Sequence, residues 1–444
     1  MRKSRFNAIF RDFAKNHLSP TPGERDFVSG IYEALQNVIG ESNSLQIGSY
    51  PRFTSITPLH DLDVLYIAGK WNPASPANPS AELSGLHTRL ERDYVNPTKY
   101  QLKISPQTHS ITLSFLENGA EVFAVDVVPA YISGTNRFGN DTYVVPEIFS
   151  KSHAGKMRKY EELRKSARQM AWIPSDPRGY IEVAKRVNDQ NSDFRKSVKL
   201  IKAWKSSCKR LDGDFKLKSF HLEQVVTGYF QNDPTLEIYD AVFKFFCDIP
   251  DIIQQSQIPD RADATRNIDA YVDSLTGGEK EKIIQARDFF LIKLENFTED
   301  DLPEDLINAG FHKRASNTEA YLFDQKIPIL SEQEFGIIGR VLPRAGGFRG
   351  KILDALGLIE IDHKIEFRLD TDAPEVDMFK WKVKNDDNSP EPRGEITDYG
   401  TLRDPEGTKY NGSHFVECYG IHNGVCTARS RQNVVLQHRF GGGK

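Results

Sequence analysis

Residues 46–67 read QIGSYPRFTSITPLHDLDVLYI. This stretch opens with Gly48 and Ser49 in a turn-like setting and ends with Asp61 and Asp63 inside an apolar, strand-like segment. Alternate side chains of a strand share a face, so the two carboxylates point together, about 6–7 Å apart. Carboxylates among apolar residues are costly to bury unless a positive group meets them. The stretch therefore predicts a cation site, and Mg²⁺, which is held by carboxylates together with substrate phosphates, fits it.

A third acidic residue belongs to the same pattern. Asp126 lies between two valines in another strand-like segment, EVFAVDVVPAY at 121–131. Two further Asp-x-Asp sequences, at 212–214 and 370–372, have turn-like neighbours and are expected in surface loops. Three acids on apolar strands instead indicate a centre of two metal ions, which activates a hydroxyl and neutralises a triphosphate and its leaving group. We predict that two Mg²⁺ ions, replaceable by Mn²⁺, bind the catalytic residues Asp61, Asp63 and Asp126.

The Gly-Ser turn has a role beside these acids. A glycine at position 48 lets the backbone approach a ligand closely, and exposed N–H groups of a turn hold phosphate oxygens. The hydroxyl of Ser49 adds another donor. We therefore predict that Gly48 and Ser49 bind a nucleotide, the alternative being that Gly48 is an ordinary turn residue.

In combination, the Gly-Ser turn, the DLD strand and the later VDVVPAY strand resemble the nucleotidyltransferase signature of the DNA polymerase β superfamily. They look most like the bacterial cGAS/DncV-like nucleotidyltransferases of the SMODS type, which are relatives of 2′-5′ oligoadenylate synthetase. The resemblance covers residues 46–131. It implies an α+β fold with a polymerase β-like mixed sheet and helices, a helical domain of the oligoadenylate-synthetase type and a small C-terminal β-rich domain.

A second stretch within residues 199–226, KLIKAWKSSCKR followed by KLKSFHLEQVV, is similar to the helical-domain motif of those enzymes. The resemblance implies that Lys202 and Ser219 hold the donor triphosphate. Lys205 follows Lys202 by about one helical turn and is expected on the same face, as a further nucleotide-binding residue. The residues alone also fit a helix N-cap at Ser219 with Glu223 near the reciprocal capping position, and a helix N-terminus attracts phosphate.

The bulk composition is that of an ordinary globular chain. It has 444 residues, a formal net charge of -4, 39% hydrophobic and 27% charged residues, which is enough for two or three domains. No apolar run approaches the roughly 20 residues of a membrane span, and the basic N-terminus lacks the apolar core of a signal peptide. We expect a cytoplasmic protein without a membrane partner.

Charge is spread unevenly along the chain. Residues 151–218 contain 19 Lys and Arg but only 8 Asp and Glu, which gives this block a net charge of +11 and leaves -15 for the rest. A basic block in an acidic protein suits an anionic ligand, although solvated helix faces are the plain alternative.

Periodicity divides the chain into regions. Apolar spacing predicts helices up to residue 38, a Pro-rich loop at 71–85, and strands at 45–49, 61–68, 98–104, 109–117 and 120–128. Later helices are expected at 155–172, 178–187, 194–210, 219–231, 237–247, 266–276, 278–298 and 318–325. The predicted domains are a catalytic core with N-terminal helices at 1–150, a helical domain completing the cleft at 151–340, a linker at 341–360 and a β-rich domain at 361–444.

The last region also carries a resemblance. DMFKWKVKN, at 377–385, and GTKYNGSHFVECYGIHNGVCTARS, at 407–430, look like the C-terminal sensor domain of many such bacterial enzymes, the adenylyl/guanylyl and SMODS C-terminal (AGS-C) domain. The resemblance covers about residues 370–440 and implies a β-sandwich-like module that recognises a nucleotide-like ligand.

Four potential zinc ligands recur every four residues in this region, namely His414, Cys418, His422 and Cys426. The pair Asn423-Gly424 predicts a two-residue hairpin turn, which pairs His422 with Val425. Cys426 then lies on the face opposite the other three side chains. Zinc needs four converging ligands, so we predict a hairpin with core cysteines instead.

The leading functional hypothesis is a template-independent nucleotidyltransferase. It would move nucleoside monophosphates from NTPs, ATP among them, to a ribose hydroxyl and release pyrophosphate. The resemblance implies a cyclic oligonucleotide second messenger for antiphage (CBASS-like) signalling, read by a separate effector protein, with activation by a nucleic-acid or nucleotide ligand left open. The alternatives are linear oligonucleotides, deoxyadenylate included, transfer to a small molecule, and a nucleotide sensor without turnover.

Overall fold

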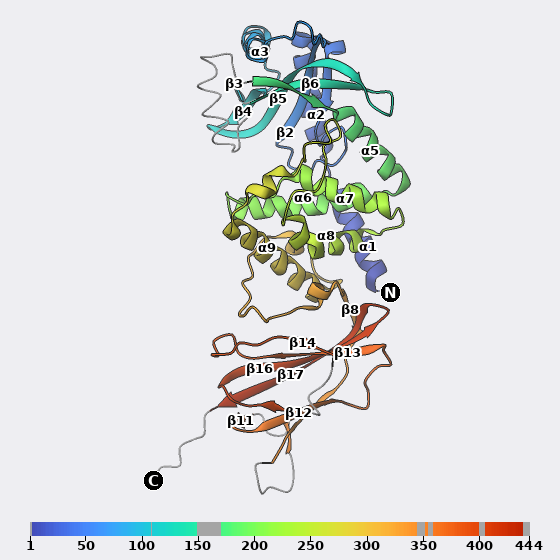
Figure 1. Ribbon diagram of the computed structural model, residues 1–444, viewed down its shortest axis with the longest axis vertical. Helices are drawn as coiled ribbons and strands as arrows, with labels where there is room; N and C mark the ends of the chain where they lie inside the picture. The colour runs from blue at the N-terminus through green and yellow to red at the C-terminus, as the bar shows by residue number, and fades with distance from the viewer. Residues whose placement is uncertain are drawn as a thin grey trace. The chain divides into compact units, whose positions relative to one another are not determined.

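The computed structural model describes residues 2–107, 109–148, 170–343, 351–353, 358–398 and 405–437. The chain divides into two compact units. The first unit combines Ala8–Val242 with Asp251–Lys280, and the second combines Met1–Asn7, Phe243–Pro250 and Glu281–Lys444. Helices and mixed strands make up the first unit, and the second contains a β-rich region (Figure 1). The predicted α+β class is therefore confirmed.

A seven-stranded mixed sheet organises the first unit. Five strands follow the order β1-β2-β5-β4-β3, and β6 joins β5 to β7. The central strands β2 and β5 are parallel, and the other described pairings in this sheet are antiparallel. The bounds are β1 Ser44–Ile47, β2 Asp61–Lys70, β3 Gln101–Pro106, β4 Ile111–Glu117, β5 Ala120–Thr135, β6 Asp141–Ile148 and β7 Met170–Ser175.

Two helices, α2 (Pro22–Ile39) and α3 (Pro79–Asp93), share one hydrophobic core with the sheet. In α2 the apolar side chains recur four apart, and the helix ends at Gly40, whose N–H donates to the carbonyl of Gln36 over 2.8 Å. The buried residues that β2 and β5 contribute to this core are Leu62, Val64, Phe123, Val125 and Val127. Strand alternation therefore places Asp61, Asp63 and Asp126 on the opposite face of the sheet, as predicted.

The following region is mainly helical. Its elements are α5 Pro177–Gln190, α6 Asp193–Leu211, α7 Ser219–Asn232, α8 Ile238–Ile252, the 3₁₀ helix η2 Ala270–Ser274 and α9 Gly277–Asn296, while α1 (Arg2–Asn16) begins the chain. No helix of the described residues has both the length and the apolar character of a membrane span.

Some element predictions differ from the structure. Residues 170–172 belong to strand β7, whereas residues 155–169 of the helix predicted there lie outside the described residues. The loop predicted at 71–85 gives way to α3 at Pro79, because the side chain of Asn78 caps that helix by accepting from the N–H of Ala81 over 3.1 Å.

The second unit contains two sheets around a shared core. One has the order β10-β9-β12-β15, and the other has β11-β17-β16-β13-β14 with β8 beside β17. The bounds are α10 Pro303–Ile307, η3 Leu322–Gln325, β8 Ile329–Gln333, β9 Ile337–Val341, β10 Lys351–Ile352, β11 Ile359–Glu360, β12 Lys364–Leu369, β13 Met378–Lys384, β14 Ile396–Thr397, β15 Glu406–Gly407, β16 Gly412–His422 and β17 Val425–Gln437.

The hairpin predicted in place of a zinc site is confirmed. Strands β16 and β17 pair His422 with Val425 and Ile421 with Cys426 around the Asn423-Gly424 turn, both of whose residues have positive φ. Cys418 and Cys426 are buried free thiols in the hydrophobic interior of the second unit.

Candidate active site

The three predicted acids come together through the register of two parallel strands. Asp63 of β2 lies directly opposite Asp126 of β5, and Asp61 precedes Asp63 by two residues on the same face. Both strands are held by the core on their other face, so the positions of the three carboxylates follow from the fold of the sheet.

Asp63 is the most perturbed of these acids. Burial, together with the charges of Asp61 and Asp126, raises the pKa of Asp63 to about 7, while Arg52 and Lys202 act in the opposite direction. A carboxyl group with this pKa exchanges its proton near neutral pH, and a cation that binds beside it favours the charged form. The site therefore has a strong local preference for added positive charge.

Gly48 lies directly against this carboxyl group. The residue has a φ of +74°, and a Cβ added there would stand 1.9 Å from Oδ2 of Asp63. Only glycine tolerates both the backbone conformation and this contact. The structure thus explains the Gly-Ser turn first as the backbone support of Asp63. The predicted contacts of Gly48 and Ser49 with a nucleotide stay predictions.

Two hydroxyl groups bind Asp126, one from Thr112 of strand β4 and one from Ser110, the residue before that strand. Ser110 donates to Oδ1 of Asp126 over 3.2 Å, and Thr112, which pairs with Asp126 across the strands, donates to the same oxygen. Hydrogen bonds to a carboxylate stabilise its charged form and fix its orientation. Neither donor was predicted from the sequence, although the alternation of Ser110, Thr112 and Ser114 marks a polar face of this strand.

The carboxylates of Asp61, Asp63 and Asp126 are chemically suitable ligands for divalent metal ions. In the conformation described, no three His, Cys, Asp or Glu side chains among the described residues stand together as ligands of one ion. Asp126 is turned towards its hydroxyl donors, and Asp63 lies against Gly48. Mutual repulsion of like charges opposes closer approach, and after burial it is the second cause of the raised pKa of Asp63. Three carboxylates on one face of adjacent strands remain suitable oxygen ligands for Mg²⁺.

Lys202 lies in a buried network that the sequence did not reveal. Its ammonium group donates to Oε2 of Glu223 over 2.6 Å and to the carbonyl and hydroxyl oxygens of Thr54, each over 3.1 Å. The guanidinium group of Arg52 binds the same carboxylate. All four residues are buried, with Glu223 fully so. Burial alone would raise the pKa of Glu223, but Arg52 and Lys202 lower it to about 2.

The start of helix α7 contradicts the N-cap that the sequence suggested at Ser219. Helix α7 begins at Ser219 with Lys218 as its N-cap, and no side chain caps it, so neither Ser219 nor Glu223 acts as a cap. Ser219 is partly buried in the first turn of α7, and its predicted role at the triphosphate stays a prediction. Lys205 is partly buried; burial and the charges of Lys209 and Lys202 lower its pKa, while Asp61 raises it. Lys205 therefore lies within electrostatic reach of the acidic site.

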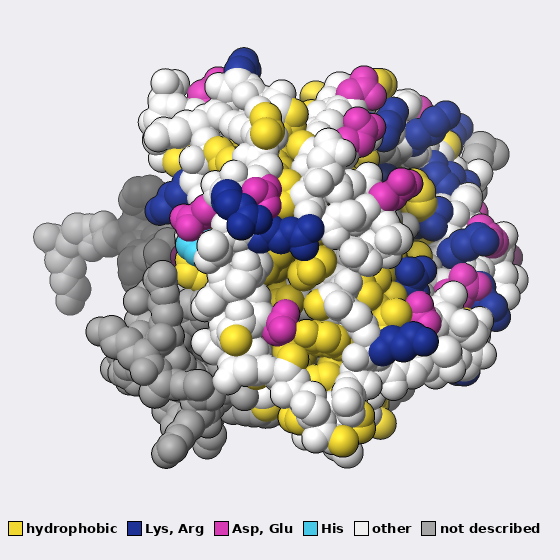
Figure 2. All heavy atoms as spheres, turned by 90° about the horizontal axis from the view of Figure 1, so that it is seen from above, with side chains coloured by type: hydrophobic (Ala, Val, Ile, Leu, Met, Phe, Trp, Pro, Cys, Tyr) yellow, Lys and Arg dark blue, Asp and Glu magenta, His cyan; other side chains and the backbone are white. Residues whose placement is uncertain are grey.

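Positive charge is concentrated on α6. The helix carries seven Lys and Arg residues, and burial together with neighbouring cations lowers the pKa of Lys199 to about 8. Crowded cations of this kind favour an anion. The other basic residues of the 151–218 block include several at 151–169, outside the described residues. On the face shown in Figure 2, Lys and Arg side chains lie among Asp and Glu side chains.

Comparison with known proteins supplies the family context. Residues 316–437 match the Adenylyl/Guanylyl and SMODS C-terminal sensor domain. The chain is 28% identical over 200 residues to a cyclic AMP-AMP-AMP synthase of Escherichia coli (strain MS 115-1), an alignment that covers 45% of this chain and 53% of that relative. It is 22% identical over 261 residues to a probable cyclic nucleotide synthase of Bacillus cereus (strain VD146), covering 51% of this chain and 71% of the relative.

Part of the chain is also similar to solved structures. The complex of CdnC from E. coli MS115-1 with HORMA-deltaN has a TM-score of 0.48 and 18% identity, covering 69% of this chain and 98% of that chain. CdnG of Bradyrhizobium diazoefficiens in complex with GTP has a TM-score of 0.45 and 12% identity, covering 68% and 96%. The sequence matches agree with the predicted resemblance: about half of the chain is similar to cyclic nucleotide synthases, and residues 316–437 match the AGS-C domain.

Proposed function

We propose that this chain is a nucleotidyltransferase that joins NTPs into a cyclic oligonucleotide and releases pyrophosphate. The observation that carries the proposal is the register of β2 and β5, which sets Asp63 opposite Asp126 and beside Asp61. The sequence similarity to cyclic nucleotide synthases supports the same reaction. As part of the proposal, the product acts in antiphage (CBASS-like) signalling through a separate effector protein in the cytoplasm.

The acidic face supplies the catalytic groups. Asp61, Asp63 and Asp126 would hold two Mg²⁺ ions, which supply neutralisation of the triphosphate and activation of the attacking ribose hydroxyl. Asp63 must lose its proton to take part, and its pKa of about 7 permits this near neutral pH. Ser110 and Thr112 orient Asp126 through their hydrogen bonds.

The remaining predicted residues position the nucleotide. The turn at Gly48 and Ser49 lies against Asp63, so its N–H groups are suited to phosphate oxygens next to the acids. Lys205 offers an ammonium group near Asp61 for the triphosphate. Lys202 is bound to Glu223 and Thr54, so we assign it a positioning role, in which it anchors the 49–54 segment.

Pyrophosphate release tests the reaction. Purified protein incubated with Mg²⁺ and the four NTPs should release pyrophosphate, and EDTA should abolish the release. Asp63→Asn should reduce turnover by roughly a hundredfold or more, because an amide cannot replace the lost negative charge. Asp214→Asn, in an exposed turn, is the matched control and should retain full activity. Activity of Asp63→Asn within tenfold of wild type would refute the assignment.

Product analysis distinguishes the alternatives. After phosphatase treatment, a cyclic product keeps all its phosphates, whereas a linear product loses its terminal phosphate, and mass spectrometry gives the nucleotide composition. Reactions with dNTPs test deoxyadenylate synthesis. A linear product would support the alternative chemistry, and no pyrophosphate with any NTP or dNTP would support a sensor without turnover.

A further inference from the structure

A polar pocket of about 500 Å³ lies in the first unit. Its lining comes from β5, β6 and β7, from the residues between β5 and β6, from the residue before α5 and from residues 261–262. Ser133, the first lining residue of β5, follows Asp126 by seven residues, which is about 20 Å of strand. The pocket is therefore separate from the three acids, and its volume is typical of sites for small molecules.

Three arginines converge on one phenylalanine at this pocket. The guanidinium carbons of these arginines lie 4.9, 4.5 and 5.6 Å from the centre of the Phe138 ring, in the order Arg137, Arg186 and Arg261. An aromatic ring attracts cations but carries no charge that would neutralise them. Cations brought together in this way repel one another unless an anion meets them.

Only one of the three arginines has a close carboxylate partner. Arg186 binds Glu182 over 2.7 Å. Nε of Arg261 lies 3.9 Å from Oδ2 of Asp176, which is too long for a hydrogen bond, and this buried nitrogen has no hydrogen-bond partner among the described residues. In the same part of the chain, no acceptor bonds to the exposed side chain of Arg137. Arg137 and Arg261 therefore keep donors for a ligand.

Asp176, the acid that lines the pocket, is held by other partners. Its Oδ1 accepts from the side-chain amide of Asn136 and from the N–H of Gly179, each over 2.8 Å, and it thereby caps α5. The side-chain oxygen of Asn136 accepts in turn from the N–H of Phe138 over 2.9 Å. The turn that presents Arg137 is thus ordered before any ligand binds.

Uncharged donors complete the lining of the pocket. Four lining residues carry aliphatic hydroxyl groups, namely Ser133, Thr135, Thr142 and Ser175. Guanidinium groups bind phosphate oxygens in a two-pronged manner, and hydroxyl groups supply further donors. An apolar ligand would instead remove these groups from water without replacing their hydrogen bonds.

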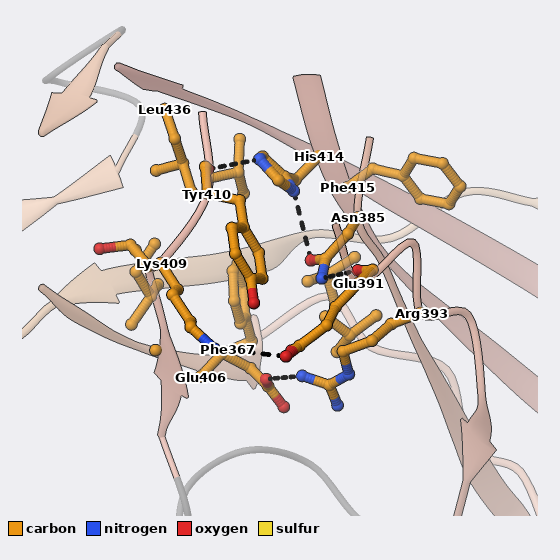
Figure 3. A pocket seen from close by; sticks show the side chains of 16 residues that line it. Phe367, Asn385, Glu391, Arg393, Glu406, Lys409, Tyr410, His414, Phe415 and Leu436 are labelled. Carbon is orange, nitrogen blue, oxygen red and sulfur yellow. Dashed lines mark hydrogen bonds and ion pairs between the residues drawn. The ribbon is translucent and has the colours of Figure 1, made fainter. Parts of the chain in front are cut away.

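A cavity of about 180 Å³ in the β-rich part of the second unit differs in this respect (Figure 3). Its cations are paired, since Arg393 binds Glu406 over 2.8 Å and Lys409 binds Glu391 over 3.2 Å. Figure 3 shows both pairs at the lower side of that cavity. An anion would have to displace a carboxylate there, whereas the pocket of the first unit offers cations that lack such a partner.

We propose that the pocket beside Arg137 and Arg261 binds a phosphate group, either free or carried by a small polar compound. The two guanidinium groups would meet the phosphate oxygens, and the hydroxyl groups would surround them. A phosphate dianion offsets two of the crowded positive charges, whereas a carboxylate offsets one and has fewer oxygens for the donors. The volume leaves space for the compound that carries the phosphate.

Calorimetric titration of the full chain, freed of metal by dialysis, tests the proposal. Without metal, the three acids repel phosphate, so the acidic site does not contribute. Ribose 5-phosphate should bind at millimolar concentration or below, and inorganic phosphate measures how much of this affinity belongs to the anion alone. Arg137→Met and Arg261→Met should each weaken binding by about tenfold, because each removes a charged hydrogen-bonding group. Arg92→Met, from an exposed pair with Asp93, is the control and should bind as wild type does.

Three outcomes would overturn the proposal. These are the absence of binding by both compounds, equal affinity of Arg137→Met and wild type, and an equal loss of affinity in Arg92→Met. A crystal soaked with tungstate, a tetrahedral oxyanion like phosphate, gives a test that needs no variant. The proposal expects an anomalous tungsten peak beside Arg137 and Arg261, and a peak only at other places would contradict it.

Discussion

At the scale of single residues, Asp63 connects the geometry of the site with a measurable property. Its pKa in the folded protein, about 7, lies above that of an unfolded aspartate, because of burial and of the charges of Asp61 and Asp126. The folded protein therefore holds this proton to higher pH than the unfolded chain does. Linkage requires that the contribution of Asp63 to metal-free stability falls as pH rises from about 4 to about 7.

Asp63→Asn removes this titration. In EDTA, the free energy of unfolding of the variant minus that of wild type should increase by roughly 2–3 kcal/mol from pH 5 to pH 8. Urea denaturation at both pH values measures the difference, with the exposed Asp214→Asn as the control that should show no such trend. Mg²⁺ at pH 8 should stabilise wild type more than Asp63→Asn. A gain independent of pH would show that Asp63 is not perturbed.

Gly48 gives a second test at this scale, because the chain offers a matched glycine. Gly48 and Gly119 both have positive φ, +74° and +82°, but a Cβ at Gly119 meets nothing within 4 Å. Gly119→Ala should cost only the backbone strain, about 1–2 kcal/mol. Gly48→Ala should cost more and should also reduce pyrophosphate release, because the methyl group displaces Asp63. Equal effects of both substitutions on stability and activity would argue against the role of this contact.

At the scale of secondary-structure elements, one buried network joins α6, α7 and the 49–54 segment. Glu223 of α7 accepts from Lys202 of α6 and from Arg52, and Thr54 donates its hydroxyl to the same carboxylate over 2.7 Å. Truncation of one member of such a network leaves the others buried with unpaired charge. The network therefore fixes the segment that follows the Gly-Ser turn.

Glu223→Gln should destabilise the protein by about 3–5 kcal/mol at pH 7. The pKa of Glu223 is lowered to about 2, so its contribution is present above the usual glutamate pKa and is lost as pH falls towards 2. The difference from wild type in urea denaturation should therefore shrink below about pH 4. Glu182→Gln, from an exposed pair with Arg186 at 2.7 Å on α5, is the control and should change stability by less than about 1 kcal/mol.

Local patterns explain which elements could be predicted. The apolar stripe of α2 and the alternation of β2, β4 and β5 depend on neighbours in sequence, so these elements were predicted from it. The end of β5 was placed at residue 128, whereas the strand continues to Thr135. The start of α3 was hidden because Pro79 and the prolines before it resemble a loop, although proline is well tolerated in the first turn of a helix.

The candidate active site could likewise be predicted only as far as neighbours in sequence determine it. The shared face of Asp61 and Asp63 follows from strand alternation, and their metal role was inferred from residue type. The burial of Lys202 could not be predicted in this way, because it depends on Thr54 and Glu223, which lie 148 and 21 residues away along the chain. The sequence around a lysine on an amphipathic helix does not show whether its side chain is buried against a glutamate or exposed to solvent.

At the scale of the whole molecule, the proposed activity and the proposed phosphate site belong to different parts of the first unit. The acidic face is formed by β2 and β5, and the arginine-lined pocket lies at β5, β6 and β7 and at the start of α5. The match to the AGS-C domain begins at residue 316, in the second unit, and the domain bounds at 150, 340 and 361 stay predictions. Each proposal has its own variants, so either can fail without the other.

The central claim is that Asp61, Asp63 and Asp126 bind divalent ions together with a nucleotide. Diffraction at the manganese edge, from crystals of the full chain grown with Mn²⁺ and a non-hydrolysable NTP analogue, tests it most directly. We expect anomalous peaks next to these three carboxylates in wild type and their loss in Asp63→Asn. Well-ordered nucleotide without any manganese peak beside the three acids would contradict the account.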